Sequence, residues 1–169
     1  MKNTLKLVLA IVIVALCSSV SAQNVKLAHI EFTELILAMP EYDSAMVKMQ
    51  KFTKELESEL ETMQVELNRK YDEFTKNQEN MSDLVKQSRW EEVQRMNERI
   101  QRFQEQAQEQ YQQEQAKLLQ PIQEKANKAI DAVAKEQGIT YVLNSQAIHF
   151  KAAGTLDLLP SVKKYLGIP

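Results

Sequence analysis

Cysteine, histidine, glycine and proline are scarce in this sequence of 169 residues, which holds one, two, three and four of them. The single cysteine, Cys17, excludes an internal disulfide framework and a cysteine-based zinc site. Only His29 and His149 could serve as histidine catalysts or ligands, and both stand between apolar neighbours, as structural histidines commonly do. Glycine-rich phosphate loops and the H-E-x-x-H zinc pattern are also missing. We therefore expect no cofactor, no metal site, no catalytic residues and no enzymatic activity.

The shortage of glycine and proline predicts long helices. From Glu41 to about Val85 neither residue occurs, and apolar side chains recur in steps of three and four. A second apolar stripe of the same spacing runs from Trp90 to Val133. This spacing is typical of one buried face on an α-helix, and the glutamate, lysine and glutamine between the apolar positions are good helix formers that suit solvent. Gly138 provides a natural stop after the second helix.

The weakest helix formers of this region lie at residues 77–83 and 87–88. We place the chain reversal there, so that residues 41–137 form an antiparallel helical hairpin, the arm, with its tip near 77–89. Pro121 lies inside the second stripe, where proline lacks the helical N–H and clashes one turn back. It predicts a kink, either as a hinge that lets the arm splay or as a fixed bend at the base.

The remaining segments, 23–40 and 138–169, form a β-rich oligomerisation body. Strands are predicted at 25–32, 140–144 and 147–151, with a turn between the last two. Residues 33–39 could form one or two helical turns. Leu158, Val162 and Leu166 recur every four residues and predict a short terminal helix. About fifty residues bury little apolar surface, and open strand edges invite pairing, so the body should self-associate symmetrically. The expected fold class is α+β, mostly α, with a coiled-coil hairpin projecting from a small β body.

The first 22 residues have the layout of a signal peptide. Lys2 and Lys6 precede the apolar run 7–17, and Ala22 fits a cleavage site before Gln23. A lipidated Cys17 is the alternative, but Leu16 stands where lipidation needs a small residue. Cleavage changes 21 basic and 23 acidic residues into 19 and 23, a net charge of −4, which disfavours nucleic acid as a partner.

Soft and aromatic side chains are the candidates for binding. Met81 and the only tryptophan, Trp90, lie beside the predicted tip. Methionine suits an adaptable binding surface, yet for the methionines in helical register the favoured interpretation is that they fill the seam between the helices. Those in question are Met46, Met49, Met63, Met81 and Met96.

Several segments resemble the Skp/OmpH family of periplasmic chaperones, in the form found in Bacteroidetes-like bacteria. They comprise residues 33–37 (TELIL), 40–42 (PEY), 118–122 (LLQPI), 129–134 (AIDAVA), 138–143 (GITYVL) and 157–158 (DL). The resemblance implies a homotrimer whose strands assemble into a central β-barrel, with three helical arms around a cavity. It further implies an ATP-independent holdase that cages unfolded outer-membrane proteins.

The best-known family members are strongly basic, whereas this mature chain is acidic, which argues against contact with lipopolysaccharide or a membrane. A structural or adaptor coiled coil of the cell envelope, bridging two components through the hairpin tip, is the alternative function.

Overall fold

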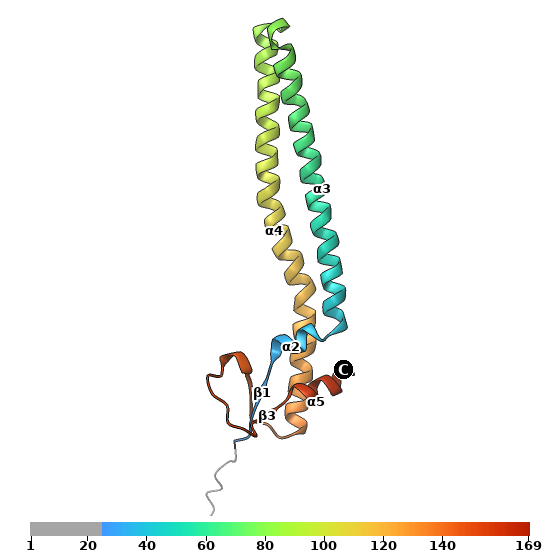
Figure 1. The fold of residues 1–169 in the computed structure, drawn as a ribbon, viewed down its shortest axis with the longest axis vertical. Helices are drawn as coiled ribbons and strands as arrows, with labels where there is room; N and C mark the ends of the chain where they lie inside the picture. Colours follow the sequence, from blue (N-terminus) through green and yellow to red (C-terminus); the bar gives the residue numbers. More distant parts are fainter. Residues whose placement is uncertain (1–24) are drawn as a thin grey trace, which may run out of the picture.

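A long helical hairpin rises from a small body (Figure 1). The structure, a computed structural model, describes residues 25–169; the predicted signal peptide and Cys17 lie outside the described residues. Helix α3 spans Pro40–Asn77 and helix α4 spans Asp83–Glu136, with a 3-10 turn, η1, at Gln78–Asn80 between them. The predicted class, a mostly α fold with an antiparallel hairpin and a small sheet, is confirmed.

The outer limits of the hairpin helices lie at residues suited to helix ends. Pro40 occupies the first turn of α3, where its missing N–H costs nothing and its fixed φ suits a helix. Beyond α4, Gly138 has a φ of 63°, a left-handed conformation that glycine adopts without a steric penalty. Helix α4 has 54 residues and α3 only 38, because α4 continues past the start of α3 into the body.

The reversal is short. It occupies residues 78–82, and Gln87 and Ser88 already belong to α4. In the last turns of α3, side chains donate back to backbone carbonyls four residues earlier: Asn77 Nδ2 donates to the Glu73 carbonyl at 2.8 Å, and Thr75 Oγ1 donates to the Tyr71 carbonyl at 3.0 Å. Such local bonds compete with regular helical bonding, which suits residues next to a helix end.

Three short strands form a wholly parallel sheet of order β2-β1-β3. The central strand β1 is Leu27–Ile30, flanked by β2 at Tyr141–Asn144 and β3 at Leu156–Asp157. The predicted strand at 147–151 is wrong. A 3-10 turn, η2, occupies Ser145–Ala147, and His149 lies in an exposed bend and not on a strand. A two-residue turn can join only antiparallel strands, whereas β2 and β3 both run parallel to β1 and need the longer connection 145–155.

The core of the body lies between the sheet, α4 and two short helices. Helix α2 spans Phe32–Leu37 and α5 spans Leu159–Leu166; the predicted terminal helix is thus present, ended by Gly167 with a φ of 70°. Because Ala126 and Ala129 are small, the other elements can approach α4 closely. The buried members from α4 are Ile122, Ala126, Ala129, Ile130 and Val133, which meet Ala28, Ile30, Leu35, Met39, Ala45, Leu158, Leu159 and Val162. This part of α4 falls within residues 41–137, the predicted arm, but packs in the body.

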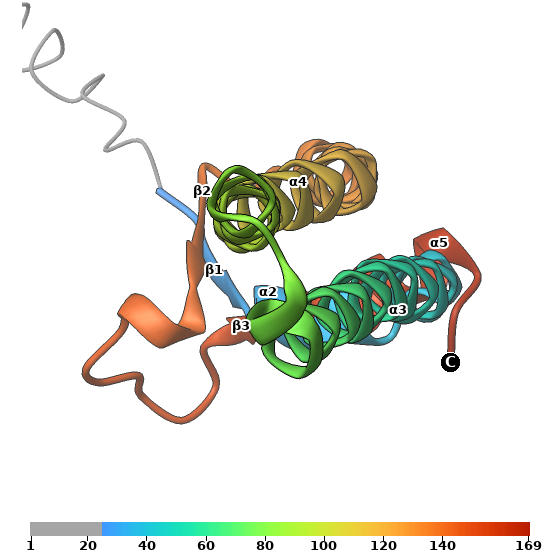
Figure 2. The same cartoon turned by 90° about the horizontal axis from the view of Figure 1, so that it is seen from above.

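A second apolar cluster holds the two helices together further out. Met63, Met96 and Ile100 are buried there, with Leu60, Leu67 and Phe103 partly buried around them. Between the clusters, no residue of α4 from 101 to 121 is fully buried. Seen from above, the arm leans toward the side on which the sheet lies (Figure 2). The arm is therefore firmly packed at its base and around Met63 and Met96, whereas no residue from 64 to 92, which includes the tip, is buried.

Candidate functional surfaces

One face of the sheet exposes large apolar side chains. Leu27 pairs with Tyr141, and His29 pairs with Leu143, so these four side chains share a face, opposite the one on which Ala28 and Ile30 meet the core. Leu27 is 51%, Tyr141 60% and Leu143 45% exposed. We call Leu27, Tyr141 and Leu143 the outer sheet face. Clustered exposed apolar side chains commonly mark an interaction site.

His29 is the buried polar residue of this face. Its Nδ1 lies 3.2 Å from Ser145 Oγ and 4.0 Å from Asp157 Oδ1. A Ser-His-Asp catalytic relay uses both ring nitrogens, one for the serine and one for the carboxylate. Here both partners meet the same nitrogen, and Asp157 Oδ1 also accepts from the Leu159 N–H at the start of α5. The cluster therefore joins β1 to the turn that follows β2 and to Asp157 of β3, which indicates a structural role for His29.

The arm tip brings the two predicted binding residues into one region. Trp90 is 43% exposed and packs against Phe74 of α3, while Met81 is half-buried beside the turn. The structure adds Leu84, which at 78% exposure is far more accessible than either. Sequence reasoning missed Leu84 because it lies on neither apolar stripe. That mismatch is itself the signal that could have identified an outward-facing apolar residue.

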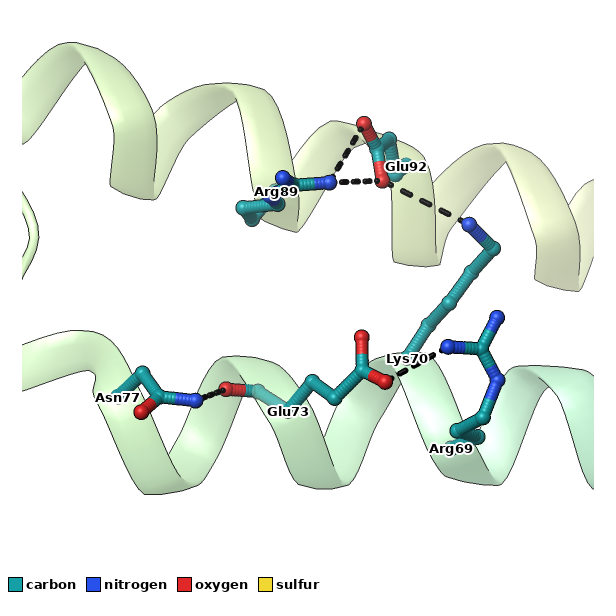
Figure 3. A network of polar contacts seen from close by, with 6 residues as sticks. All are labelled: Arg69, Lys70, Glu73, Asn77, Arg89 and Glu92. Atoms are coloured by element: carbon teal, nitrogen blue, oxygen red, sulfur yellow. Dashed lines mark hydrogen bonds and ion pairs between the residues drawn. The ribbon is translucent and has the colours of Figure 1, made fainter.

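An ion-pair network crosses the arm just below the tip (Figure 3). Lys70 Nζ of α3 lies 3.6 Å from Glu92 Oε2 of α4, and Arg89 Nη1 lies 3.0 Å from the same oxygen. The hydrogen bond from Arg89 lowers the pKa of the Glu92 carboxyl, and the charge of Lys70 lowers that pKa further. Glu92 therefore ties the two helices together at this level.

The five methionines differ in their burial and in their position along the arm. Met49, Met63 and Met96 are buried, and Met46 packs half-buried against the body core. These four lie along the seam, whereas Met81 lies at the tip.

Pro121 lies inside α4, which continues through it without interruption. The lower part of α4, toward the body, follows a different direction from its upper part (Figure 1). Close by, Lys125 of α4 forms an ion pair with Glu41 in the first turn of α3, and this hydrogen bond lowers the pKa of the Glu41 carboxyl. The base of the arm is thus connected across both helices at the level where proline weakens α4.

Within residues 25–169, acidic, histidine and cysteine side chains gather in no group of three that could hold a metal ion. Over the same range, none of the helices combines the length and the apolar character needed to cross a bilayer.

Comparisons with known proteins agree with this architecture. The sequence profile of the family described as "Outer membrane protein (OmpH-like)" matches residues 26–166. No curated protein matches the chain in sequence. Among solved structures, the chain is similar to a candidate outer membrane chaperone (OmpH-like) from Caulobacter crescentus CB15. The alignment has a TM-score of 0.74 and 13% identity and covers 84% of this chain and 83% of the other. At that identity the likeness concerns the fold.

Proposed function

The chain belongs to the OmpH-like outer membrane protein family, and from this premise we propose that it is an ATP-independent periplasmic holdase for unfolded outer-membrane proteins. The observation that carries the proposal is a protruding arm on a body that exposes an apolar sheet face. Such a protein can enclose a client between several arms without catalysis, cofactor or nucleotide.

The client's chemistry explains why enclosure would help. Outer-membrane strands alternate apolar and polar residues, and in water their unpaired edges and apolar faces associate with other chains. Arms that surround such a chain prevent these contacts through many weak interactions. Trp90 and Met81, with the exposed Leu84, offer apolar contacts at the tip, and we assign them to client binding.

Several arms require several subunits, and the outer sheet face supports a homotrimer. The outer edges of β2 and β3 have no strand partner within residues 25–169. Because β2 and β3 differ, joining one edge to the other is a head-to-tail contact, which gives a ring such as a trimer when the rotation between subunits closes. The three sheets would then form the central barrel.

Sedimentation equilibrium of the mature protein tests this assembly. We expect a trimer, and a monomer for the double variant Tyr141→Ser/Leu143→Ser. The matched control, Leu84→Ser/Val85→Ser at the tip, should remain trimeric. A monomeric wild-type protein would contradict both the barrel and the cage.

Localisation follows from the first 22 residues, which we propose to be a cleaved signal peptide that delivers the chain to the periplasm. The mature net charge of −4 gives no general attraction to anionic lipopolysaccharide or membranes. Mass spectrometry of protein purified from the periplasm should find Gln23 at the N-terminus and Cys17 absent.

Light scattering tests the activity itself. An unfolded outer-membrane protein is diluted from urea into buffer with the purified mature protein in excess. We expect scattering to be suppressed without ATP, and the monomeric Tyr141→Ser/Leu143→Ser variant to suppress it poorly. Unchanged aggregation beside the wild-type trimer would count decisively against a holdase.

The exposure of Leu84 at the tip favours a second candidate, an adaptor that bridges two envelope components. Deleting residues 75–92 discriminates between the two. A holdase keeps partial activity from the remaining arm walls, whereas an adaptor loses all partner binding.

A further inference from the structure

A groove lies at the base of the arm, between the start of α3 and the part of α4 around Pro121. Its volume is about 540 Å³, within the range of roughly 300–1,000 Å³ that small-ligand sites occupy. Its apolar part comes from Ala45, Leu118, Pro121 and Ile122, of which Ala45 and Ile122 are 4% exposed and belong to the body core. The floor is therefore well packed, and the groove opens over it.

The rim of the groove is basic. Lys48, Lys117 and Lys125 line it together with a single acid, Glu41. Glu41 is already occupied by its ion pair with Lys125. Lys117 contacts Glu114, although its side chain is 73% exposed, and Lys48 forms no ion pair within residues 25–169. In an acidic chain, this rim offers positive charge beside an apolar floor.

Pro121 adds a hydrogen-bond acceptor. In a regular helix the N–H of residue 121 would donate to the carbonyl of Lys117, but proline has no N–H. Both residues line the groove. The Lys117 carbonyl is thus available to a donor outside the helix, such as the backbone N–H of an extended peptide.

We propose that this groove binds an extended segment of unfolded client in which an apolar side chain stands next to an acidic one. The apolar side chain covers Ala45 and Ile122, the carboxylate meets Lys48 and Lys117, and a backbone N–H of the segment donates to the Lys117 carbonyl. The inference rests on the proposed holdase function and adds to it a local preference within an otherwise diffuse binding surface.

Fluorescence anisotropy with labelled twelve-residue peptides tests the groove in the full mature protein. One peptide carries a central leucine-aspartate pair, the second has asparagine in place of the aspartate, and the third is N-methylated at the leucine. Two partly exposed ion pairs contribute little each, so the acidic peptide should bind roughly threefold to tenfold more tightly than its amide twin at low salt. N-methylation should weaken binding because it removes the donor.

The double variant Lys48→Gln/Lys117→Gln should lose the preference for the acidic peptide. Its matched control, Lys54→Gln/Lys128→Gln, removes the same charge from exposed positions of α3 and α4 that do not line the groove, and should keep the preference. Equal binding of acidic and amide peptides, or an equal loss in the control, overturns the proposal. An unchanged affinity after N-methylation also overturns it, in favour of an anionic amphiphile such as a fatty acid.

The aggregation assay separates this proposal from the holdase function. If the wild-type protein suppresses aggregation but does not discriminate between the peptides, the groove assignment alone fails. If it suppresses no aggregation, the proposed function fails.

Discussion

The rings of Phe74 on α3 and Trp90 on α4 meet across the arm, with centroids 5.6 Å apart and planes inclined by 41°. Offset and tilted arrangements of this kind are the ones aromatic pairs favour. One turn closer to the body, Lys70 and Glu92 connect the same two helices. Together the two contacts hold the helices in register at the far end of the arm, although Trp90 remains 43% exposed.

Phe74→Leu should loosen the tip and alter the environment of Trp90. The lost ring contact is worth about 0.5–1.5 kcal/mol beyond the area it buries, so the urea midpoint of the distal arm should fall. Trp90 is the only tryptophan, and its fluorescence emission should shift toward the red. Tyr71→Leu, one turn away on α3, is the control and should leave the emission unchanged.

Acid should weaken the arm at both ends. The pKa values of Glu41 and Glu92 are lowered by hydrogen bonds from Lys125 and Arg89. Since a lowered pKa means that the folded state favours the charged form, each contribution is present above about pH 4.5 and lost as the pH falls through the folded pKa. The melting temperature, followed by circular dichroism, should drop over that range.

In the double variant Glu41→Gln/Glu92→Gln, the dependence of the melting temperature on acid should flatten. Glu105→Gln, an exposed position of α4, is the control and should retain the wild-type dependence. A wild-type melting temperature that stays constant below pH 4.5 would show that these ion pairs contribute nothing to the arm.

Pro121→Ala should stabilise and straighten α4, because the new N–H can donate to the Lys117 carbonyl and the ring clash disappears. The free energy of unfolding should rise by up to about 3 kcal/mol. Small-angle X-ray scattering should detect a changed maximum dimension if Pro121 fixes a bend, and a narrower distribution if it is a hinge. Gln120→Ala, at an exposed neighbouring position, should alter stability by less than about 0.5 kcal/mol.

Leu158→Ala should unfold the body before the arm. Leu158 is fully buried, and truncating a buried leucine to alanine costs about 2–5 kcal/mol. Its backbone N–H also donates to the His29 carbonyl, so the body sheet should loosen as well. Urea unfolding measures the loss, with Leu84→Ala at the tip as a control that should be close to neutral. Equal midpoints for the two variants would contradict the assigned body core.

The arm could be predicted closely because its signals are local. Apolar residues three and four positions apart share one helix face whatever surrounds them, and Gly138 ends α4 through its own backbone conformation. The reversal, predicted near residues 77–89, lies at 78–82, and Gln87 and Ser88 belong to α4. A weak helix-forming residue is outweighed there by the tertiary contacts of the flanking turns, including the pair of Phe74 and Trp90.

The body could be predicted only in part. Its composition indicated strands and a terminal helix, but the parallel pairing of β2 and β3 with β1 joins segments more than a hundred residues apart. A local pattern records alternation and turns and says nothing about which strand lies beside which. For that reason the segment after Ser145 was mistaken for the second strand of a hairpin.

By itself the sequence determined two long amphipathic helices, their reversal and the small size of the body, because periodicity, helix-stopping residues and length are properties of neighbouring residues. Only the tertiary structure decided that residues 122–133 of α4 form the core of the body, and that Pro121 lies beside a basic groove. It also placed Leu27, Tyr141 and Leu143 together on an open face. These features depend on contacts between segments that are far apart in the sequence. Whether a residue is buried depends on which of those segments packs against it.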